Sequence, residues 1–201
     1  MTASIVPIVE GQSEVEAVPI LLRRLLAEMG LSSVIVARPF RVKRTKVVRP
    51  GELERTVEQA VRSRTNVGAV LLIMDADDDC PAQLGPFLAQ RARQSTSVPV
   101  SVVLAAREFE AWFLGAKESL RGQRRIRPDA VAPQNPEAIR GAKEELTSNM
   151  SGSRYLPVDD QPFFAQAMDI AMARAQCPSL ARLFRELERL ARHVLSAQSG
   201  G

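Results

Sequence analysis

The sequence contains few of the residues that build disulfide scaffolds and zinc sites. Its 201 residues include two cysteines, Cys80 and Cys177, and one histidine, His193. These are too few for a four-ligand structural zinc site, and a lone histidine restricts imidazole catalysis. We therefore expect reduced thiols, a cytoplasmic protein, and chemistry that is carried by other side chains.

Long apolar stretches are also missing. The longest apolar run covers residues 67–74, far short of the roughly 20 residues that span a bilayer. Residues 1–6 lack the basic segment that precedes the apolar part of a signal peptide. We expect neither a signal peptide nor a membrane partner. With 45% hydrophobic and 25% charged residues, the composition excludes a mostly disordered or collagenous chain.

Up to residue 105, short β-branched apolar runs alternate with amphipathic segments, a pattern typical of α/β domains. Strands are expected at 3–9, 33–37, 67–74 and 98–104, and helices at 13–29, 51–64 and 82–94. This order predicts a mostly parallel sheet flanked by helices, because parallel neighbours require crossover connections. In addition, Pro7 suggests an edge position or a bulge for the first strand, and Ser13 with Glu16 predicts a capping box.

After residue 105 the pattern becomes helical. Helices are expected at 108–120, 137–149 and 162–175, and a strongly amphipathic helix begins at Pro178. We predict an α/β domain over residues 1–118 and an all-helical C-terminal extension over residues 119–201 that packs on it. An exposed part of the apolar stripe on the last helix would permit a homodimer.

Acidic side chains follow two of the predicted strands. Glu10 follows the first strand, Glu14 lies one helical turn further on, and Asp75 and Asp77 follow the apolar run at 67–74. Ligands of a parallel sheet bind beyond the carboxyl ends of its strands, so these carboxylates are expected in one crevice. An extended backbone would point the two aspartates to the same side.

Carboxylates that converge in this way repel one another unless a cation neutralises them. Hard oxygen ligands suit Mg²⁺ or Mn²⁺ rather than zinc, and Mg²⁺ keeps coordination positions that phosphate oxygens take. The residues therefore predict a metal-dependent phosphoryl-transfer site. A plainer interpretation stays open, in which Glu10 is a solvated turn residue, Glu14 a favourable charge in the first turn of a helix, and the aspartates part of a polar loop.

Several motifs give the chain a family resemblance. The segment Ile8-Val-Glu-Gly-Gln-Ser-Glu14, followed by Leu72-Ile-Met-Asp-Ala-Asp77, resembles the Toprim signature of a strand-end glutamate and a later Asp-x-Asp. A smaller Toprim-like family, DUF4276, is similar in three further segments: Arg107-Glu-Phe-Glu-Ala-Trp-Phe-Leu114, Tyr155-Leu-Pro and Cys177-Pro-Ser-Leu-Ala-Arg-Leu-Phe184. The resemblance thus covers most of the chain.

The resemblance implies a Toprim-like fold with an acidic metal site. The metal ligands that it implies are Glu10, Glu14, Asp75, Asp77 and Glu110. Of these, Glu10, Asp75 and Asp77 would also be catalytic. Glu110 follows the fourth strand and is expected to approach the same crevice, with Glu108 as its competitor for that role.

Toprim domains occur in topoisomerases, primases and the overcoming-lysogenization-defect (OLD) nucleases, to which the chain is distantly similar. Unlike OLD nucleases, this chain has no Gly-x-x-x-x-Gly-Lys-Ser/Thr phosphate loop. It also lacks the zinc module of a primase and the large tyrosine-bearing domain of a topoisomerase. The resemblance therefore implies a stand-alone Toprim-like nuclease that works with a separately encoded ATPase partner, and it hints at phage defence.

Basic side chains gather in two segments. The first follows the second predicted strand, and its expected nucleic-acid contacts are Arg41, Lys43, Arg44 and Lys46. The second lies in the linker and contains Arg121, Arg124, Arg125 and Arg127. Phosphate charge favours such loops near a metal site, although ordinary solvated loops are the alternative for both. Lys and Arg outnumber Asp and Glu by 27 to 23, a surplus compatible with an anionic partner.

The expected function is therefore hydrolysis of nucleic-acid phosphodiesters with Mg²⁺ or Mn²⁺. Two alternatives stay open: a non-catalytic Toprim-like subunit that binds nucleic acid or an ATPase, and a phosphohydrolase that acts on a small phosphate ester. A failure to bind metal would favour the first alternative. Salt-sensitive binding to long nucleic acid would count against the second.

Overall fold

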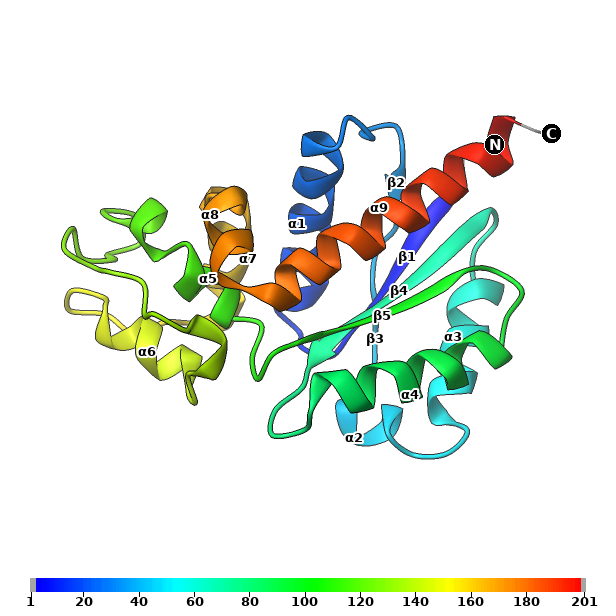
Figure 1. The fold of residues 1–201 in the computed structure, drawn as a ribbon, viewed down its shortest axis with the longest axis horizontal. Helices are drawn as coiled ribbons and strands as arrows, with labels where there is room; N and C mark the ends of the chain where they lie inside the picture. Colours follow the sequence, from blue (N-terminus) through cyan, green and yellow to red (C-terminus); the bar gives the residue numbers. More distant parts are fainter. Residues whose placement is uncertain (1–2, 200–201) are drawn as a thin grey trace.

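A computed structural model describes residues 3–199, apart from the side chain of Ser199. A parallel sheet lies between two layers of helices, and a cluster of short helices lies beyond one end of it (Figure 1). The elements in chain order are β1 (Ser4–Val9), α1 (Glu14–Glu28), β2 (Ile35–Val36), β3 (Phe40–Arg41), α2 (Arg44–Val47), α3 (Glu52–Arg62), β4 (Val67–Asp75), α4 (Pro81–Gln94), β5 (Val100–Ala105), α5 (Ala111–Gly115), η1 (Lys117–Leu120), η2 (Pro136–Ala138), α6 (Ala142–Ser148), α7 (Pro157–Ala167), α8 (Ile170–Gln176) and α9 (Pro178–Ser199).

The predicted fold class, an α/β sheet flanked by helices, is confirmed. The five strands pair in the order β2-β1-β4-β5, with β3 also on β1, and every pairing between them is parallel. The apolar run of β4 is an inner strand between β1 and β5. A core lies on each of its faces, as its composition predicts. After β5 the described chain forms helices and loops, apart from one isolated bridge between Ile126 and Met150.

Pro7 lies inside β1, yet β1 is an inner strand, so the expected edge position is wrong. The alternative, a bulge, occurs in β1 as a register shift against β4, but between Ser4 and Ile5 rather than at Pro7. The carbonyls of Ile5 and Val9 accept hydrogen bonds from the N–H groups of Ala37 (3.0 Å) and Val42 (2.9 Å). Pro7 lies midway between them, on the same side of the strand, where β2 has ended and β3 has not begun. The N–H group that proline lacks would face this gap.

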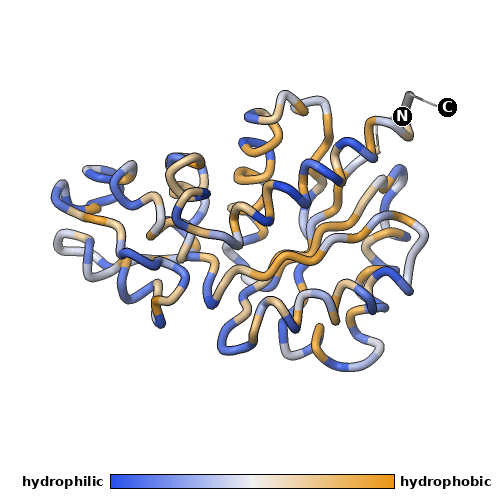
Figure 2. The backbone as a smooth tube through the Cα atoms, viewed as in Figure 1, coloured by the Kyte–Doolittle hydropathy of each residue, from blue (hydrophilic) through white to orange (hydrophobic). Residues whose placement is uncertain are grey.

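Apolar side chains alternate between two cores, one on each face of the sheet. Leu71 and Ile73 pack in the core that α1 and α9 cover, whereas Val70 and Leu72 pack in the core that α3 and α4 cover. Figure 2 shows the strands as a continuous hydrophobic band between these layers. The apolar stripe of α9 is buried against the first core. The homodimer was predicted from an exposed part of this stripe. It stays a prediction, because the burial of the stripe removes that basis without testing the dimer itself.

Several predicted elements are divided in the structure. Of the strand expected at 33–37, only β2 (Ile35–Val36) forms, and a second short strand, β3, follows after residues 37–39. The basic run after it contains the short helix α2. The helix expected at 108–120 is interrupted at Ala116, where φ is −115° and ψ is 18°. The helix expected at 162–175 is α7 and α8, because Met168 is extended and Asp169 begins α8 by accepting a hydrogen bond from the N–H of Met172 at 2.8 Å.

The start of α1 corrects the predicted capping box. Ser13 is the N-cap residue, but its side chain makes no capping hydrogen bond, and the backbone there is already helical. Instead the carboxylate of Glu14 turns back and accepts a hydrogen bond from the N–H of Glu10 at 3.1 Å. Gly30 ends the helix with φ of 70°, as expected.

The helical region shares its core with the sheet domain. One buried cluster includes Ile5 of β1, Trp112 of α5, Phe164 of α7 and Leu187 of α9. The boundary near residue 118 stays a prediction. No helix within residues 3–199 is both long enough and apolar enough to cross a membrane.

Close packing at Gly115 gives a first prediction. A Cβ atom at this position would lie 2.6 Å from the Sγ of Cys177. We expect Gly115→Ala to lower the free energy of unfolding by about 1–3 kcal/mol because the core is overpacked, measured by urea denaturation. Adding Cys177→Ala should recover part of the loss.

The matched control is Gly85→Ala in α4. The nearest atoms to a Cβ at this position are guanidinium nitrogens of Arg182, 3.9 Å away. Alanine should raise stability there by about 0.5–1 kcal/mol, because it favours the helix over the unfolded chain. Equal effects at the two glycines would contradict the packing described at Gly115.

Candidate functional site

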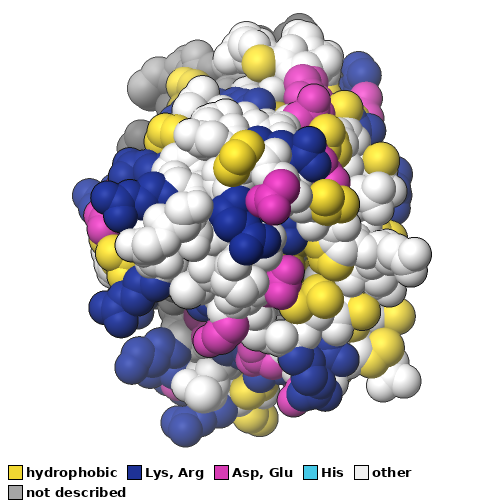
Figure 3. Space-filling view, turned by 90° about the vertical axis from the view of Figure 1, so that its left-hand side faces the viewer, with side chains coloured by type: hydrophobic (Ala, Val, Ile, Leu, Met, Phe, Trp, Pro, Cys, Tyr) yellow, Lys and Arg dark blue, Asp and Glu magenta, His cyan; other side chains and the backbone are white. Residues whose placement is uncertain are grey.

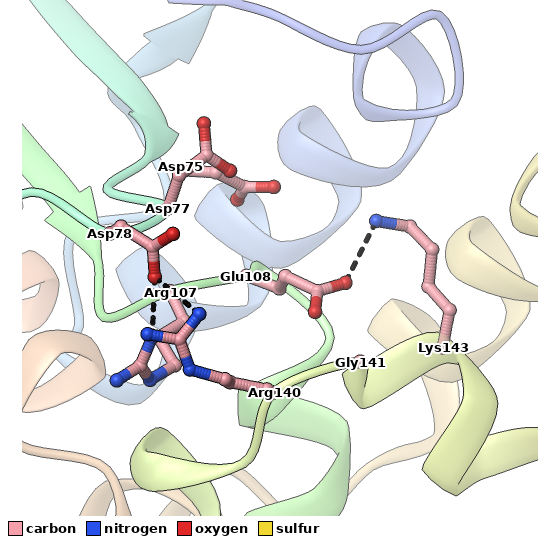
Figure 4. A pocket seen from close by; sticks show the side chains of 8 residues that line it. All are labelled: Asp75, Asp77, Asp78, Arg107, Glu108, Arg140, Gly141 and Lys143. Carbon is pink, nitrogen blue, oxygen red and sulfur yellow. Dashed lines mark hydrogen bonds and ion pairs between the residues drawn. The ribbon is translucent and has the colours of Figure 1, made fainter.

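A pocket of about 230 Å³ lies beyond the carboxyl ends of β4 and β5. It is built from the loops after these strands and from the start of α6 (Figure 4). The lining residues are Asp75, Asp77, Asp78, Arg107, Glu108, Arg140, Gly141 and Lys143. The pocket thus lies at the predicted position, beyond the carboxyl ends of parallel strands, where ligands of such sheets bind.

Asp75 ties the end of β4 to the segment after β5. It is the last residue of β4 and is half-buried. Its Oδ1 accepts a hydrogen bond from the N–H of Phe109 at 2.7 Å. Because Glu108 and Glu110 flank Phe109, this bond brings the acidic residues of the two loops to one place.

Glu10 and Glu14 approach from β1 and α1. Glu10 follows β1 and is half-buried, whereas Glu14, in the first turn of α1, is 6% exposed. Gly11 makes this approach possible, because a Cβ there would lie 2.7 Å from the Oε1 of Glu14. Any side chain at residue 11 would therefore push the Glu14 carboxylate out of place.

Glu110 is held by neutral donors from the helical region. It is 1% exposed, and its Oε1 accepts hydrogen bonds from the hydroxyl of Tyr155 (3.2 Å) and the side-chain amide of Gln161 (3.3 Å). Burial, and next the charge of Glu110, raise the pKa of Tyr155, so the hydroxyl keeps its proton and donates. The Oε1 of Gln161 is buried without a hydrogen-bond partner in the described chain.

Lys143 of α6 brings a positive charge to Glu108 and Glu110. Its Nζ lies 3.1 Å from Oε2 of Glu108 and 3.3 Å from Oε2 of Glu110. The ion pair with Glu108 is drawn in Figure 4. Burial opposes the charge of Lys143, but the carboxylates of Glu110, Glu108 and Asp75 outweigh it and raise the pKa of Lys143. Lys143 therefore stays protonated and partly neutralises its acidic neighbours. We name the site formed by the mutually repelling carboxylates of Glu10, Glu14, Asp75, Asp77 and Glu110 the acidic crevice.

The acidic side chains resist ionising together. Burial raises the pKa of Glu14 to about 7, and the charges of Glu110 and Glu10 add to this effect. Burial, followed by the charges of Glu14 and Glu110, raises the pKa of Asp75 well above its usual value. Burial also raises the pKa of Glu10, and that of Glu110 although Lys143 opposes it. An added cation would favour the ionised form of each carboxyl group.

The loop after β4 is clamped by arginines. Asp77 has a left-handed backbone (φ 50°), so the extended geometry on which its predicted orientation depended does not occur. Arg44 lies 3.4 Å from Asp77, forms a close ion pair with Asp79, and donates to the carbonyl of Ala76. Of the predicted nucleic-acid contacts, Arg44 is therefore directed to the acidic loop.

Asp78 lies on the other side of this loop and pairs with two arginines. The guanidinium of Arg107 is 3.0 Å from its Oδ1, and that of Arg140 is 2.8 Å away (Figure 4). Both arginines line the pocket. The pocket thus presents fixed positive charge beside its carboxylates.

A larger groove of about 510 Å³ adjoins the acidic residues, between β3 and α3. Arg41, Lys43 and Lys46, three of the predicted nucleic-acid contacts, line it and are exposed. Arg41 also connects the groove to the crevice, because its Nε donates to the carbonyl of Glu10 at 3.1 Å. We name this surface the basic groove.

The residue types at the crevice fit a hard divalent cation better than their present placement does. All the acidic ligands offer oxygen, which Mg²⁺ and Mn²⁺ prefer. Among residues 3–199, however, no three His, Cys, Asp or Glu side chains are grouped so that they could hold a metal ion. The carboxylates instead face Lys143, Arg44 and backbone N–H groups. Cation binding would require some of them to turn.

The structure brings together residues that local sequence patterns did not. Lys143, Gln161 and Tyr155 reach the crevice from α6, α7 and the loop between them, far along the chain from β4. Tyr155 carried a signal, since it belongs to a segment that resembles the family. Lys143 and Gln161 carried none, because their positions depend on how the helical region folds back.

Comparisons with known proteins give a family without an activity. No curated protein matches the chain. No solved structure matches it either. The family model described as a domain of unknown function, DUF4276, matches residues 9–188, which include every acidic and basic residue of the site described above. The chain therefore belongs to the DUF4276 family.

Proposed function

We propose that the protein is a metal-dependent nuclease that hydrolyses phosphodiester bonds of nucleic acid, with a Toprim-like arrangement of its acidic residues. One observation carries the proposal. Carboxylates from the ends of β1, β4 and β5 share a crevice in which their pKa values are raised, next to the basic groove. Such a crevice favours a cation, and the groove favours a polyanion.

The proposed ligands of the cation are Glu10, Glu14, Asp75, Asp77 and Glu110. When bound, Mg²⁺ or Mn²⁺ would supply Lewis-acid stabilisation of the phosphodiester and a nucleophilic water. Glu10, Asp75 and Asp77 are the proposed catalytic carboxylates. The metal site requires the side-chain turns noted above, which substrate phosphate and metal together would favour.

The basic residues of the pocket would balance its negative charge and position the substrate phosphate. Arg107 and Arg140 line the pocket and form ion pairs with Asp78, so their guanidinium groups are already oriented beside the space that a phosphate would enter. Lys143 holds Glu108 and Glu110. Guanidinium groups bind phosphate oxygens in a fork geometry, which suits the positioning of a backbone without reading its bases.

The present pairing of Lys143 with Glu110 specifically favours one alternative. A carboxylate that a lysine already neutralises does not need a metal, which agrees with a non-catalytic subunit that binds nucleic acid or an ATPase partner. A phosphohydrolase for a small phosphate ester would use the pocket of about 230 Å³ alone and leave the basic groove unused. The following experiment separates these functions.

The test incubates purified protein with supercoiled plasmid, single-stranded DNA and RNA, with Mg²⁺, Mn²⁺ or EDTA. We expect cleavage that requires the metal and stops with EDTA. Binding of nucleic acid without cleavage under any of these conditions would favour the non-catalytic subunit. Hydrolysis of a small phosphodiester, with no binding to long nucleic acid, would favour the phosphohydrolase.

The basic groove provides a separate prediction. Replacing Lys43 and Lys46 together with Gln should weaken binding of single-stranded DNA and reduce the slope of log K against log salt concentration by about 1–2, because each lysine that contacts a phosphate contributes about 0.7. Fluorescence anisotropy at several salt concentrations measures both effects. The control is Arg62→Gln with Arg93→Gln, which removes the same charge from exposed positions outside the groove.

A further inference from the structure

A second basic surface lies on the helical region, apart from the basic groove. Residues 121–127, which we name the arginine loop, carry four exposed arginines: Arg121, Arg124, Arg125 and Arg127. In the described part of the chain only Arg127 of these four has an ion pair, with Asp129 at 3.3 Å. Figure 3 views this end of the molecule, where Lys and Arg side chains gather along one side and at the lower rim.

The arginine loop has a well-defined backbone. Ile126 is 1% exposed and anchors the loop in the core. The N–H of Gly122 donates to the carbonyl of Ile126 at 2.9 Å, and the N–H of Arg127 donates to the carbonyl of Asn149 at 2.9 Å. The carbonyl of Arg125 accepts from the N–H of Ser151 at 2.8 Å. The arginines are therefore presented from a fixed frame, which lowers the ordering cost of binding.

Two consecutive arginines in this loop have a backbone conformation that favours glycine. Arg124 has φ of 45° and Arg125 has φ of 65°. Side chains with a Cβ are strained there, and glycine would adopt the same conformation without strain. Among residues 3–199, Arg124 lies over the ring of Phe163 at 4.8 Å, and Arg125 donates to the carbonyl of Gly152 at 3.3 Å. The contact of Arg124 uses its charge against the face of the ring, but neither arginine is paired with a carboxylate in the described residues.

The same loop is joined to the acidic crevice. Its partner segment continues through the exposed Arg154 to Tyr155, whose hydroxyl donates to Glu110 at 3.2 Å. We propose that the arginine loop binds the phosphate backbone of an extended nucleic-acid strand, at a distance from the bond that the crevice would cleave. The proposal rests on the proposed function for its substrate class, and it makes that substrate a long strand rather than a short oligonucleotide.

The chemistry of the loop favours phosphate over an acidic protein. Guanidinium groups contact phosphate oxygens bidentately, and such contacts position a strand without reading its sequence. Protein interfaces usually need an apolar centre. The single large apolar side chain of the loop, Ile126, is buried and unavailable for one.

The test measures binding with EDTA present, so that it does not depend on cleavage. Fluorescence anisotropy compares single-stranded DNA of roughly 4 nucleotides, near the lower end of single-strand site sizes, with DNA of roughly 30 nucleotides. We expect Arg124→Gln with Arg125→Gln to weaken binding of the long strand by about tenfold and to reduce its salt slope by about 1–2. Binding of the short strand should change less than twofold.

The charge-matched control is Arg93→Gln with Arg185→Gln, two exposed arginines on α4 and α9. It should leave both affinities unchanged. An equal loss in this control, an equal loss for the short strand, or binding only to an acidic peptide would overturn the proposal. If the wild type binds the long strand through these arginines but never cleaves it, the proposed function fails and the arginine-loop proposal stands.

A second pair of variants separates a binding role from a structural one. Arg124→Gly and Arg125→Gly remove the charge and also relieve the backbone conformation. A binding role predicts an unchanged or higher Tm together with weaker binding of the long strand. A lower Tm with unchanged binding would show that these arginines only support the fold.

Discussion

Replacing Asp75 with Asn is expected to lower the rate of nucleic-acid cleavage by roughly 10³-fold. Asp75 closes β4, lines the pocket, and lies among the charges of Glu14 and Glu110. Loss of one negative ligand should remove several kcal/mol of charge stabilisation around a bound cation. Each 1.4 kcal/mol corresponds to a tenfold change in rate, so about 4 kcal/mol gives this factor. Initial rates on plasmid DNA with Mg²⁺ measure it.

Asparagine is the informative substitution because it preserves the local structure. Its side-chain oxygen still accepts the hydrogen bond that Asp75 receives from the N–H of Phe109 at 2.7 Å. The link between the ends of β4 and β5 therefore remains, and Tm should not fall. Asp75→Ala removes this acceptor as well, and its lower Tm would separate folding from catalysis.

The matched control is Asp159→Asn, which removes a carboxylate of the same type from an exposed position in α7. It should change the cleavage rate less than twofold. A folded Asp75→Asn protein that cleaves as fast as the wild type would exclude Asp75 from the reaction and shift the proposal toward the non-catalytic subunit.

The sheet could be predicted from the sequence because its strands have strong local patterns. The run that forms β4 is almost entirely apolar and the run that forms β5 is rich in β-branched residues, and the helix α4 separates them. Pro7 shows where local patterns end. Its position is explained by the break between β2 and β3 on the neighbouring strand, which depends on pairing between distant segments.

Of the candidate site, likewise, only the part on the sheet could be predicted from the sequence. Glu10 and Asp75 could be placed together because the carboxyl ends of parallel strands meet at one edge of the sheet. The helical region follows weaker patterns, so its contributions were missed. Lys143 reaches Glu110 because α6 folds back beside the crevice, and no spacing along the chain reports that contact. Arg44 was predicted as a nucleic-acid contact, and in the structure it forms ion pairs with Asp77 and Asp79 of the loop after β4.

The stability of the metal-free protein is expected to fall as pH rises from about 4.5 to about 7. In the folded protein burial raises the pKa of Glu14 from 4.5 to about 7. Between these values the folded protein keeps a proton that the unfolded chain has lost, so rising pH favours unfolding. This difference corresponds to about 3 kcal/mol at pH 8. The raised pKa values of Glu10, Asp75 and Glu110 act in the same direction.

Glu14→Gln should flatten this dependence. Glutamine keeps an oxygen for the N–H of Glu10, which donates to Glu14 at 3.1 Å, and it cannot ionise. The variant should match the wild type at pH 5 and exceed its free energy of unfolding at pH 8, measured by urea denaturation in EDTA. Glu16→Gln, on the exposed side of the same helical turn, is the control and should follow the wild type at both pH values.

Divalent cations should reverse the loss, because a bound cation offsets the repulsion that raises these pKa values. At about 100 times its Kd, a ligand that binds only the folded state stabilises it by about 2.7 kcal/mol, or roughly 5–10 °C in Tm for a domain of this size. We expect such a shift with Mg²⁺ or Mn²⁺ at pH 8, and a smaller one at pH 5, where protons compete for the carboxylates. Glu14→Gln should reduce the shift at pH 8. An equal shift in this variant and in the wild type would exclude Glu14 as a ligand, and no shift at either pH would exclude the metal site itself.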